Sequence, residues 1–232
     1  MMYSSEWKYA LKNSIPVMMG YWVLGFAFGL LLSAQGLGWP WALGMSLVIY
    51  AGALQFAAVG FFAAKLGWIP IAVASLFINI RQAFYGLSLL QKFARTGWRK
   101  LYLIHALTDE TYALLTTIPV PDDLDPKRYY FYLGALNQSY WVTGSVLGAL
   151  VGGSVAFDTR GVSFSLTALF VVLAIENYRI RPQMLPFAIG AVASVAALIT
   201  VHPSNMLIAS IAGALVMLFA LRRRIEAGAT RA

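Results

Sequence analysis

The chain has 232 residues, of which 60% are hydrophobic and 11% are charged. A soluble domain has about 25% charged residues and could not bury so much apolar surface, so the composition excludes a soluble enzyme, a disordered chain and a nucleic-acid-binding domain. The net charge is +8, and many of the lysines and arginines lie in short stretches beside apolar runs. Basic residues in such places anchor membrane proteins on the cytoplasmic side. There is no cysteine, which excludes disulfides and thiolate metal sites.

Eight apolar segments are candidate membrane helices, because crossing a bilayer takes about 20 predominantly apolar residues. Their continuous apolar character predicts an all-α, polytopic transmembrane bundle of seven or eight segments rather than a β-barrel, which would alternate apolar and polar residues. We expect a single integral membrane domain over 1–232, without a cleaved signal peptide. The predicted segments are 14–34, 39–64, 68–90, 101–118, 129–153, 164–179, 183–200 and 204–221.

Two of these segments are irregular. Segment 39–64 is long and interrupted by glycines, and segment 101–118 carries His105, Asp109 and Glu110. If all eight segments cross, the basic stretch at 91–100 lies outside the cell, against the positive-inside rule. A re-entrant or broken helix in either irregular segment moves that stretch inside, and such backbone is tolerated where protein or water satisfies it. The last two segments form either two short spans or one broken hairpin.

Two stretches of the chain resemble each other. Residues 21–25 read Tyr-Trp-Val-Leu-Gly and residues 140–144 read Tyr-Trp-Val-Thr-Gly, and each continues into a G-x-x-x-G motif. The similarity reflects either chance within an apolar alphabet or a duplication, with halves at about 13–100 and 129–221 and a substrate site between them. In both cases small residues one turn apart allow close helix packing. The glycines predicted to do so are Gly25, Gly29, Gly144 and Gly148.

Three charged residues cannot be placed at loops or helix ends: Arg81, Asp109 and Glu110. A charge at the centre of a transmembrane helix costs about 2.5–3.5 kcal/mol of insertion free energy, so such residues are functional by default. These three charges either form a substrate site or form a structural ion pair between segments 68–90 and 101–118.

Segment 68–90 carries a polar stripe. With helical spacing, Asn79 and Gln82 fall on one line with Gly86, and Arg81 and Tyr85 fall on a neighbouring line. Lipid would not tolerate this stripe, so it faces a partner helix or a wet cavity, where Asn79, Gln82 and Tyr85 are candidates for substrate binding. The guanidinium of Arg81 stays charged and matches a carboxylate with two donors, which predicts an anion-binding role.

Segment 101–118 carries the acidic side of the predicted site. His105 and Asp109 have i, i+4 spacing and would touch on a continuous helix. Asp109, Glu110 and His105 are candidates for proton coupling, and the two carboxylates are candidates for binding an ammonium group. Alternatively, part of this segment lies at the interface, where these groups are simply hydrated. Gln55 stands alone in an apolar run and either ties helices together or binds substrate.

Several catalytic motifs are missing from the sequence. There is no G-x-x-x-x-G-K-[ST], no H-E-x-x-H and no G-x-S-x-G. We therefore expect no enzymatic activity, no cofactor and no metal site.

The motifs taken together resemble the AzlC family, which includes the YgaZ-type exporters. The resemblance is carried by segments that read GFAFG at 25–29, YAGALQFA at 50–57, NIRQAFYG at 79–86 and LTDE at 107–110. It covers residues 13–118 well and continues more loosely to about 200. Where the family often has histidine after the arginine, this chain has Gln82, which puts a proton role at that position in doubt.

The resemblance implies a function. AzlC-like proteins are large subunits of bacterial branched-chain amino-acid exporters, so it implies export of valine, leucine, isoleucine or similar neutral amino acids across the cytoplasmic (inner) membrane. It also implies a small hydrophobic AzlD-like partner subunit. Assembly into a homo-oligomer is a further expectation. The rival interpretations are a channel or permease for another solute, and a non-transporting scaffold subunit whose charges only pair with one another.

Overall fold

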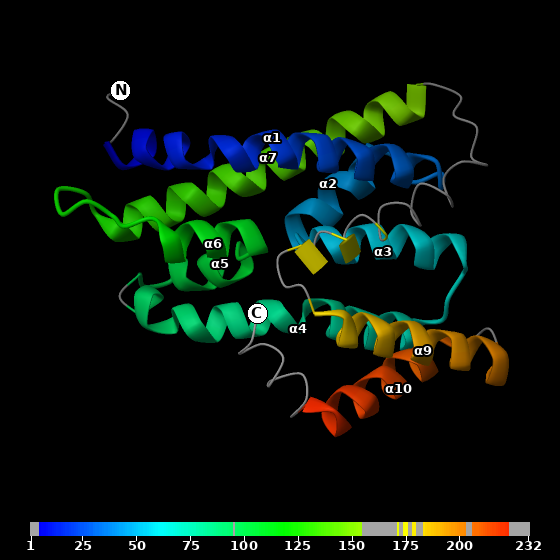
Figure 1. Cartoon of the computed structure of the whole chain (residues 1–232). Helices are drawn as coiled ribbons and strands as arrows, with labels where there is room; N and C mark the ends of the chain where they lie inside the picture. Colours follow the sequence, from blue (N-terminus) through cyan, green and yellow to red (C-terminus); the bar gives the residue numbers. More distant parts are fainter. Residues whose placement is uncertain are drawn as a thin grey trace. The chain divides into compact units, whose positions relative to one another are not determined.

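The computed structural model describes residues 5–94, 96–154, 183–202 and 206–222, and positions 171, 174, 175, 178 and 179. Every regular element in these ranges is an α-helix (Figure 1), which confirms the all-α prediction. The chain divides into two compact units, one formed by Met1–Val59 with Ile78–Thr159 and the other by Gly60–Phe77 with Arg160–Ala232. The predicted segment 164–179 lies almost entirely outside the described residues.

Two long helices form the centre of the first unit. Helix α1 (Ser5–Ser33) and helix α7 (Pro126–Ser154) run in the same direction (Figure 1). Each has 29 residues, more than the roughly 20 needed to cross a bilayer. Helix α1 begins before the predicted apolar segment 14–34. The polar side chains of its first turns are compatible with a helix that continues beyond the hydrocarbon region of the bilayer.

The two helices approach each other at the glycines. A Cβ on Gly25 would stand 2.9 Å from the backbone oxygen of Trp141, and a Cβ on Gly144 would stand 3.0 Å from that of Trp22. These contacts are reciprocal, because Trp22 and Gly25 occupy the same places in the first Tyr-Trp-Val motif as Trp141 and Gly144 in the second. One turn later, the same reciprocal pattern joins Gly29 to the oxygen of Ser145 and Gly148 to that of Phe26.

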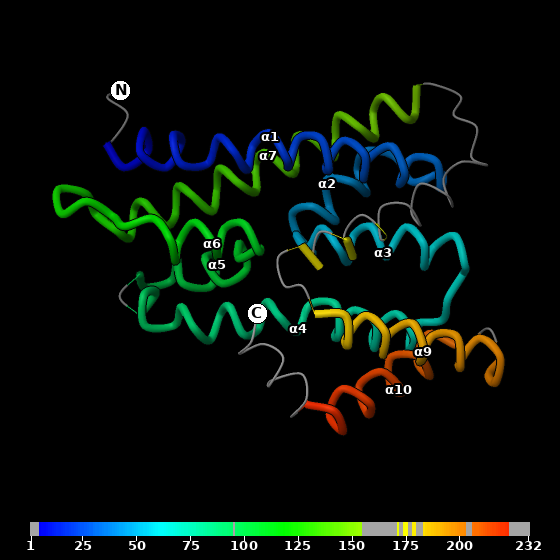
Figure 2. The backbone as a smooth tube through the Cα atoms, in the orientation of Figure 1, coloured from blue at the N-terminus to red at the C-terminus, as the bar shows by residue number. Residues whose placement is uncertain are grey.

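A helical hairpin follows α1. Helix α2 (Trp39–Val48) leads to a turn at Tyr50, and α3 (Gly52–Ala63) runs back (Figure 2). Tyr50 has a φ of 42°, in the left-handed region that is costly for a bulky residue, and this conformation breaks the helix. The predicted segment 39–64 is therefore two helices instead of one continuous helix.

A second hairpin is formed by α5 (Arg99–His105) and α6 (Asp109–Thr117), which are separated by the non-helical residues 106–108 (Figure 2). Thr108 caps α6, since its hydroxyl accepts a hydrogen bond from the backbone N–H of Thr111 at 3.2 Å. The predicted i, i+4 contact between His105 and Asp109 is wrong, because the chain between them leaves the helix and turns their side chains toward different partners.

Both ends of the α5–α6 hairpin lie at one end of the first unit. The same end of the unit holds the start of α1. The Arg99 guanidinium lies 5.4 Å from the ring centre of Phe131 in α7. At the other limb, the Tyr9 hydroxyl donates to the carbonyl of Pro119 at 3.0 Å. Because these contacts involve the first turns of α7 and α1, we call this end of the first unit the N-terminal end.

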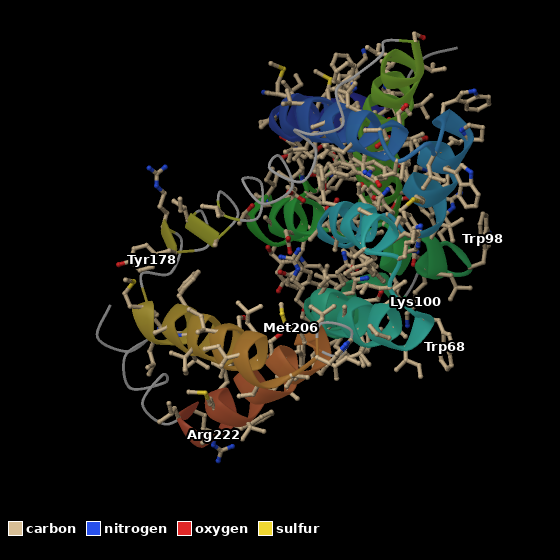
Figure 3. All side chains as sticks on the ribbon, turned by 90° about the vertical axis from the view of Figure 1, so that its right-hand side faces the viewer. Trp68, Trp98, Lys100, Tyr178, Met206 and Arg222 are labelled. Atoms are coloured by element: carbon tan, nitrogen blue, oxygen red, sulfur yellow. The ribbon has the colours of Figure 1, made fainter. Side chains whose placement is uncertain are left out.

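Helix α4 (Trp68–Phe93) finishes at the same N-terminal end. Its Lys92 ammonium donates to the carbonyl of Leu115 near the end of α6, at 2.7 Å. In the turn that follows, Trp98 points away from the ribbon beside Lys100 (Figure 3). The basic stretch predicted at 91–100 therefore lies at the same end of the first unit as the basic first turns of α1.

In the second unit, α9 (Met184–Thr200) packs on α10 (Met206–Ala220). The buried residues of α9 are Ile189, Ala193 and Ala197, which recur every four positions and form one face of the helix. A Cβ on Gly213 of α10 would stand in ordinary contact with Ala193, 3.7 Å away. Small side chains at this contact allow the two helices to lie close together.

Large apolar side chains cover much of the outer surface of the described helices. Val48, Leu101 and Ile199, for example, are each more than three-quarters exposed. Within the described ranges, α1 and α4 are long and apolar enough to cross a membrane, and α3, α9 and α10 are shorter apolar helices. A surface of this kind is suited to lipid rather than to water.

Candidate functional site

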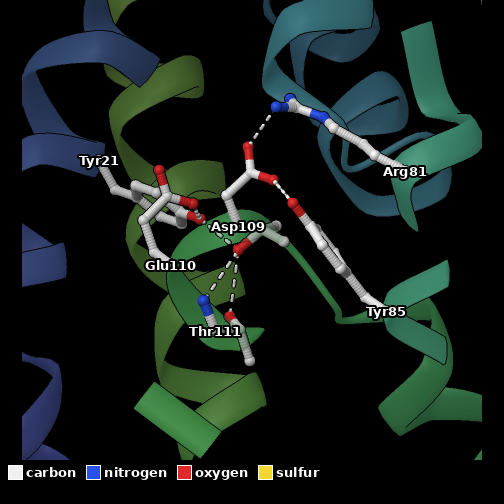
Figure 4. Close-up of polar contacts among 7 residues, drawn as sticks. Tyr21, Arg81, Tyr85, Asp109, Glu110 and Thr111 are labelled. Carbon is white, nitrogen blue, oxygen red and sulfur yellow. Dashed lines mark hydrogen bonds and ion pairs between the residues drawn. The ribbon is translucent and has the colours of Figure 1, made fainter. Parts of the chain in front are cut away.

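The candidate site lies where α6 begins, between α4 and α1. Asp109 and Glu110 are the first two residues of α6 and reach toward different helices (Figure 4). The break at 106–108 produces this arrangement, because consecutive residues in the first turn of a helix project in different directions. A helix start leaves its first N–H groups without partners inside the helix, and the Thr108 hydroxyl satisfies one of them, that of Thr111.

Asp109 is bound from α4 by two side chains. Nη1 of Arg81 lies 2.7 Å from Oδ2 of Asp109, and the hydroxyl of Tyr85 donates to Oδ1 at 2.7 Å. Arg81 and Tyr85 are one helical turn apart, so α4 presents both to the same carboxylate. The side chains of Arg81 and Asp109 remain 43% and 40% exposed, so the ion pair is accessible from one side.

Glu110 has a separate partner on α1. The hydroxyl of Tyr21 donates to Oε2 of Glu110 at 2.6 Å and also lies 2.6 Å from the hydroxyl of Thr108. Tyr21 is 5% exposed, whereas Glu110 is exposed. The two adjacent carboxylates thus differ in chemistry, since Asp109 is neutralised by a guanidinium and Glu110 accepts from a neutral phenol. No cation of the described chain forms an ion pair with Glu110.

The tips of the two hairpins, α2–α3 and α5–α6, meet beside Asp109 and Glu110. The break at Tyr50 leaves the carbonyl of Leu47 without the backbone N–H that a continuous α2 would supply from Ala51. Instead, this carbonyl contacts Nε2 of His105 at 2.9 Å and the side-chain amide of Gln138 at 3.3 Å. His105 thus joins the two breaks. The structure brings it to Leu47 and not to Asp109.

Among the described residues, the partners of Asp109 and Glu110 are Arg81, Tyr85 and Tyr21, and none of the three predicted amides is one of them. Gln55 is fully buried, donates to the hydroxyl of Ser46 at 3.2 Å and accepts from the indole N–H of Trp141 at 2.8 Å. It therefore ties α3 to α2 and α7. Asn79 and Gln82 are half-buried on α4, on either side of Arg81.

Sequence reasoning missed Tyr21, Thr108 and Tyr50. Tyr21 stands in the repeated Tyr-Trp-Val motif, but a phenol in an apolar helix has no distinctive signal. Thr108 immediately precedes two acidic residues, as an N-cap does, and this signal would have marked a helix start inside segment 101–118. Tyr50 precedes Ala51-Gly52, and nothing local predicts a left-handed tyrosine there.

Comparison with known proteins identifies the family. Residues 16–155 match the family described as AzlC protein. The chain is 33% identical over 217 residues to the "Branched-chain amino acid transport protein AzlC" of Bacillus subtilis (strain 168), covering 94% of this chain and 85% of that protein. It is 28% identical over 193 residues to the "Inner membrane protein YgaZ" of Escherichia coli (strain K12), covering 79% of each.

A third relative matches almost end to end. An "Uncharacterized membrane protein" of Helicobacter pylori (strain ATCC 700392 / 26695) is 38% identical over 219 residues, covering 94% of this chain and 96% of that protein. No solved structure matches the chain. The relatives and the apolar helices place the protein in the cytoplasmic (inner) membrane. A family match over more than half of the chain, together with these relatives, shows that the protein belongs to the AzlC family of membrane transport proteins.

Proposed function

We propose that the protein is a secondary transporter subunit that exports branched-chain or other small neutral amino acids across the cytoplasmic membrane. The observation that carries the proposal is the Arg81–Asp109 ion pair, which lies beside the meeting point of two broken helices. Transporters commonly bind substrates where helices are interrupted near the bilayer midplane. The substrate class follows the Bacillus subtilis relative, whose name specifies branched-chain amino-acid transport.

In this mechanism the substrate enters between Arg81 and Asp109. Its carboxylate takes the guanidinium of Arg81, and its ammonium takes the carboxylate that Arg81 releases. One ion pair is replaced by two, so no unpaired charge is left in an apolar environment, where it would be costly. Tyr85 keeps its hydrogen bond to Asp109 and holds the carboxylate in place. Proton or ion coupling falls to Glu110, which has no cationic partner within the described chain.

The contacts of the remaining predicted residues support their predicted roles to different degrees. Asn79 and Gln82 flank Arg81 on α4 and remain candidates for substrate contact. Gln55 is occupied by Ser46 and Trp141, which favours a structural role. His105 is engaged by a backbone carbonyl, so its role in proton coupling has the weakest support of the three predicted coupling residues.

The proposed membrane arrangement has α1, α4 and α7 crossing, with the two hairpins re-entering from opposite sides. It is supported by the parallel direction of α1 and α7 and by the contacts that place the ends of α4 and α6 at the N-terminal end, beside the start of α1. The basic stretch at 91–100 then lies on the cytoplasmic side, as the positive-inside rule requires. The reciprocal contacts of α1 and α7 support the predicted duplication, in which an axis along the membrane normal relates two helices.

A partner belongs to this proposal. The AzlC resemblance supports a small hydrophobic AzlD-like subunit, and the exposed apolar helices offer surface for such a subunit or for a second copy of the chain. The stoichiometry follows from measuring the mass of the assembly purified with and without that subunit.

The proposal is tested by efflux of labelled leucine from vesicles, with and without the small subunit. Uphill efflux driven by an ion gradient is expected, and purely downhill flux would indicate a channel instead. Arg81→Ala, inserted at normal levels, is expected to abolish efflux. Normal efflux by this variant would refute the role of Arg81, and absence of leucine efflux under every condition would favour the scaffold interpretation.

A further inference from the structure

Contacts between α4 and α6 continue beyond the candidate site, toward the N-terminal end of the first unit. Tyr85 stacks on Tyr112, with ring centres 4.3 Å apart and ring planes 16° apart. Further along α4, the hydroxyl of Ser88 donates to that of Tyr112 at 3.3 Å. The last contact is that of Lys92 with the carbonyl of Leu115, at 2.7 Å. We call this row of contacts the α4–α6 seam, and its members are Arg81, Tyr85, Ser88 and Lys92 on α4 and Asp109, Tyr112 and Leu115 on α6.

The seam follows one face of each helix. Its residues on α4 are spaced by four, three and four positions, and those on α6 by three, as on one side of a helix. The residue numbers of the contacts rise together, so α4 and α6 run in the same direction, away from the candidate site. Tyr85 and Tyr112 therefore lie between the Arg81–Asp109 ion pair and the N-terminal end. A solute that moves along the seam has to pass these two rings.

The contacts of the seam are made by the ends of α4 side chains. Where α1 meets α7, by contrast, the backbones themselves approach, and a Cβ on Gly25 would stand 2.9 Å from a backbone oxygen of α7. Ser88 and Lys92 are exposed, and Tyr85 and Tyr112 are half-buried. Exposed polar contacts contribute little to stability, because water can replace either partner. The seam is therefore easier to open than the contact between α1 and α7.

Lys92 occupies a carbonyl that α6 leaves free. Inside a helix, the carbonyl of Leu115 would accept from the backbone N–H four residues later, but that residue is Pro119, which has no N–H. The ammonium of Lys92 takes the place of this donor. Its positive charge is also favourable near the C-terminal end of a helix. Because the side chain of Lys92 is exposed, water can replace it when the end of α4 moves.

The stacked rings close the seam between the candidate site and Lys92. At 4.3 Å between their centres, the rings of Tyr85 and Tyr112 are in contact and leave no room for water between them. The hydroxyl of Tyr85 stands at the edge of its ring and donates to Asp109 (Figure 4). The stacked face and this hydrogen bond are thus separate, so the rings can part while Tyr85 stays on Asp109.

We propose that the α4–α6 seam is a gate through which the substrate passes between the candidate site and the N-terminal end of the first unit, and that Tyr112 closes this gate by stacking on Tyr85. The proposal rests on the proposed transport function and adds the route of the substrate. When the gate opens, the end of α4 beyond Tyr85 moves away from α6, and the contacts of Ser88 and Lys92 break. Helices α1 and α7 stay packed on each other throughout.

The first test locks the seam in the full-length protein. The chain has no cysteine, so Ser88→Cys and Tyr112→Cys introduce its only two thiols. A bifunctional thiol reagent that a reductant can cleave bridges them, and the mass of the protein reports the extent of bridging. Downhill flux of labelled leucine is then measured in vesicles. Bridging is expected to lower this flux by about tenfold or more, because the gate cannot open, and the reductant is expected to restore it.

The matched control bridges α1 to α7. The indole N–H of Trp22 donates to the hydroxyl of Thr143 at 3.2 Å, so this pair joins an aromatic side chain to a hydroxyl across two helices, as Tyr112 and Ser88 do. Bridging of Trp22→Cys to Thr143→Cys should leave the flux unchanged, because these helices do not separate. Equal losses of flux in the two bridged proteins, or unchanged flux after bridging across the seam, would overturn the proposal.

The second test removes the ring of Tyr112. Tyr112→Phe keeps the stacked ring and is expected to retain uphill efflux. Tyr112→Ala leaves the gate open, so leucine leaks back whenever the other side of the site opens. The leucine gradient that this variant builds is expected to fall by about tenfold or more. Leucine binding should stay within about twofold of the unchanged protein, measured as the rise of the unfolding midpoint with leucine in detergent.

The outcomes separate a wrong gate from a wrong function. If the unchanged protein transports leucine while Tyr112→Ala and Tyr112→Phe behave alike, the gate is refuted and the proposed transport stands. If Tyr112→Ala loses leucine binding, Tyr112 belongs to the binding site and the gate is also refuted. If the unchanged protein neither binds nor transports leucine, the proposed function is wrong and the gate fails with it.

Discussion

Nε2 of His105 lies 2.9 Å from the backbone oxygen of Leu47, and this contact joins the tips of two helical hairpins that approach from opposite ends of the first unit. The carbonyl is available because α2 breaks at Tyr50, and the imidazole reaches it because α5 ends at His105. Each break therefore depends on the other. This mutual dependence explains how non-helical backbone persists inside a helical membrane protein.

The first prediction concerns His105. His105→Ala removes one of the two partners of the Leu47 carbonyl and is expected to lower the free energy of unfolding by about 0.5–1.5 kcal/mol, because the carbonyl keeps only the hydrogen bond from Gln138. His105→Gln keeps an N–H donor and should recover most of this loss. Denaturant unfolding in mixed micelles measures both variants. Leucine efflux by a folded His105→Gln protein is expected to persist, and its complete loss would instead support a proton-coupling role.

The second prediction concerns the contact between α1 and α7. Gly29→Ala places a methyl group against the backbone oxygen of Ser145, and backbone cannot rotate away as a side chain can. Overpacking of this kind costs about 1–3 kcal/mol. Gly20→Ala is the matched control on the same helix, since nothing lies within 4 Å of a Cβ there. It should be neutral or slightly stabilising, because alanine is the better helix former. Equal effects of the two substitutions on unfolding would contradict the close-packing interpretation.

The third prediction tests whether the Arg81–Asp109 pair is structural or functional. Arg81→Ala or Asp109→Ala alone leaves one charge unpaired and is expected to reduce folding stability and to abolish leucine efflux. The double variant removes both charges, so its stability should recover, measured by unfolding. Its leucine efflux should stay absent, because the substrate carboxylate and ammonium have lost their partners. Efflux that recovers together with stability would mean that the pair only holds α4 to α6.

The fourth prediction concerns topology and uses the absence of cysteine in the chain. Single cysteines at Trp98 and Asp123 should be protected from a membrane-impermeant maleimide in intact cells and should react in inverted vesicles, because both lie at the N-terminal end of the first unit. Gln35→Cys, in the turn after α1, should show the reverse pattern. External labelling of Trp98→Cys would contradict the re-entrant arrangement and support a crossing by every predicted segment.

Much of the fold was predictable from local pattern. Long apolar runs predicted α1, α4 and α7 to within a few residues at most ends, and repeated motifs drew attention to the glycines at which α1 meets α7. Charges inside apolar runs indicated Arg81, Asp109 and Glu110. The same local reasoning produced the error at His105, since i, i+4 spacing has meaning only on an unbroken helix.

The sequence by itself determined that this is a helical membrane protein of a transport family, because apolar length, charge placement and motif similarity are properties of short stretches of chain. Only the tertiary structure decided that Asp109 pairs with Arg81 while Glu110 turns to Tyr21, and that Tyr50 breaks one helix where His105 ends another. The physical reason is that a broken helix is stable only if its freed backbone groups find partners. Here the carbonyl of Leu47 finds its partner 58 residues further along the chain, which no local pattern records.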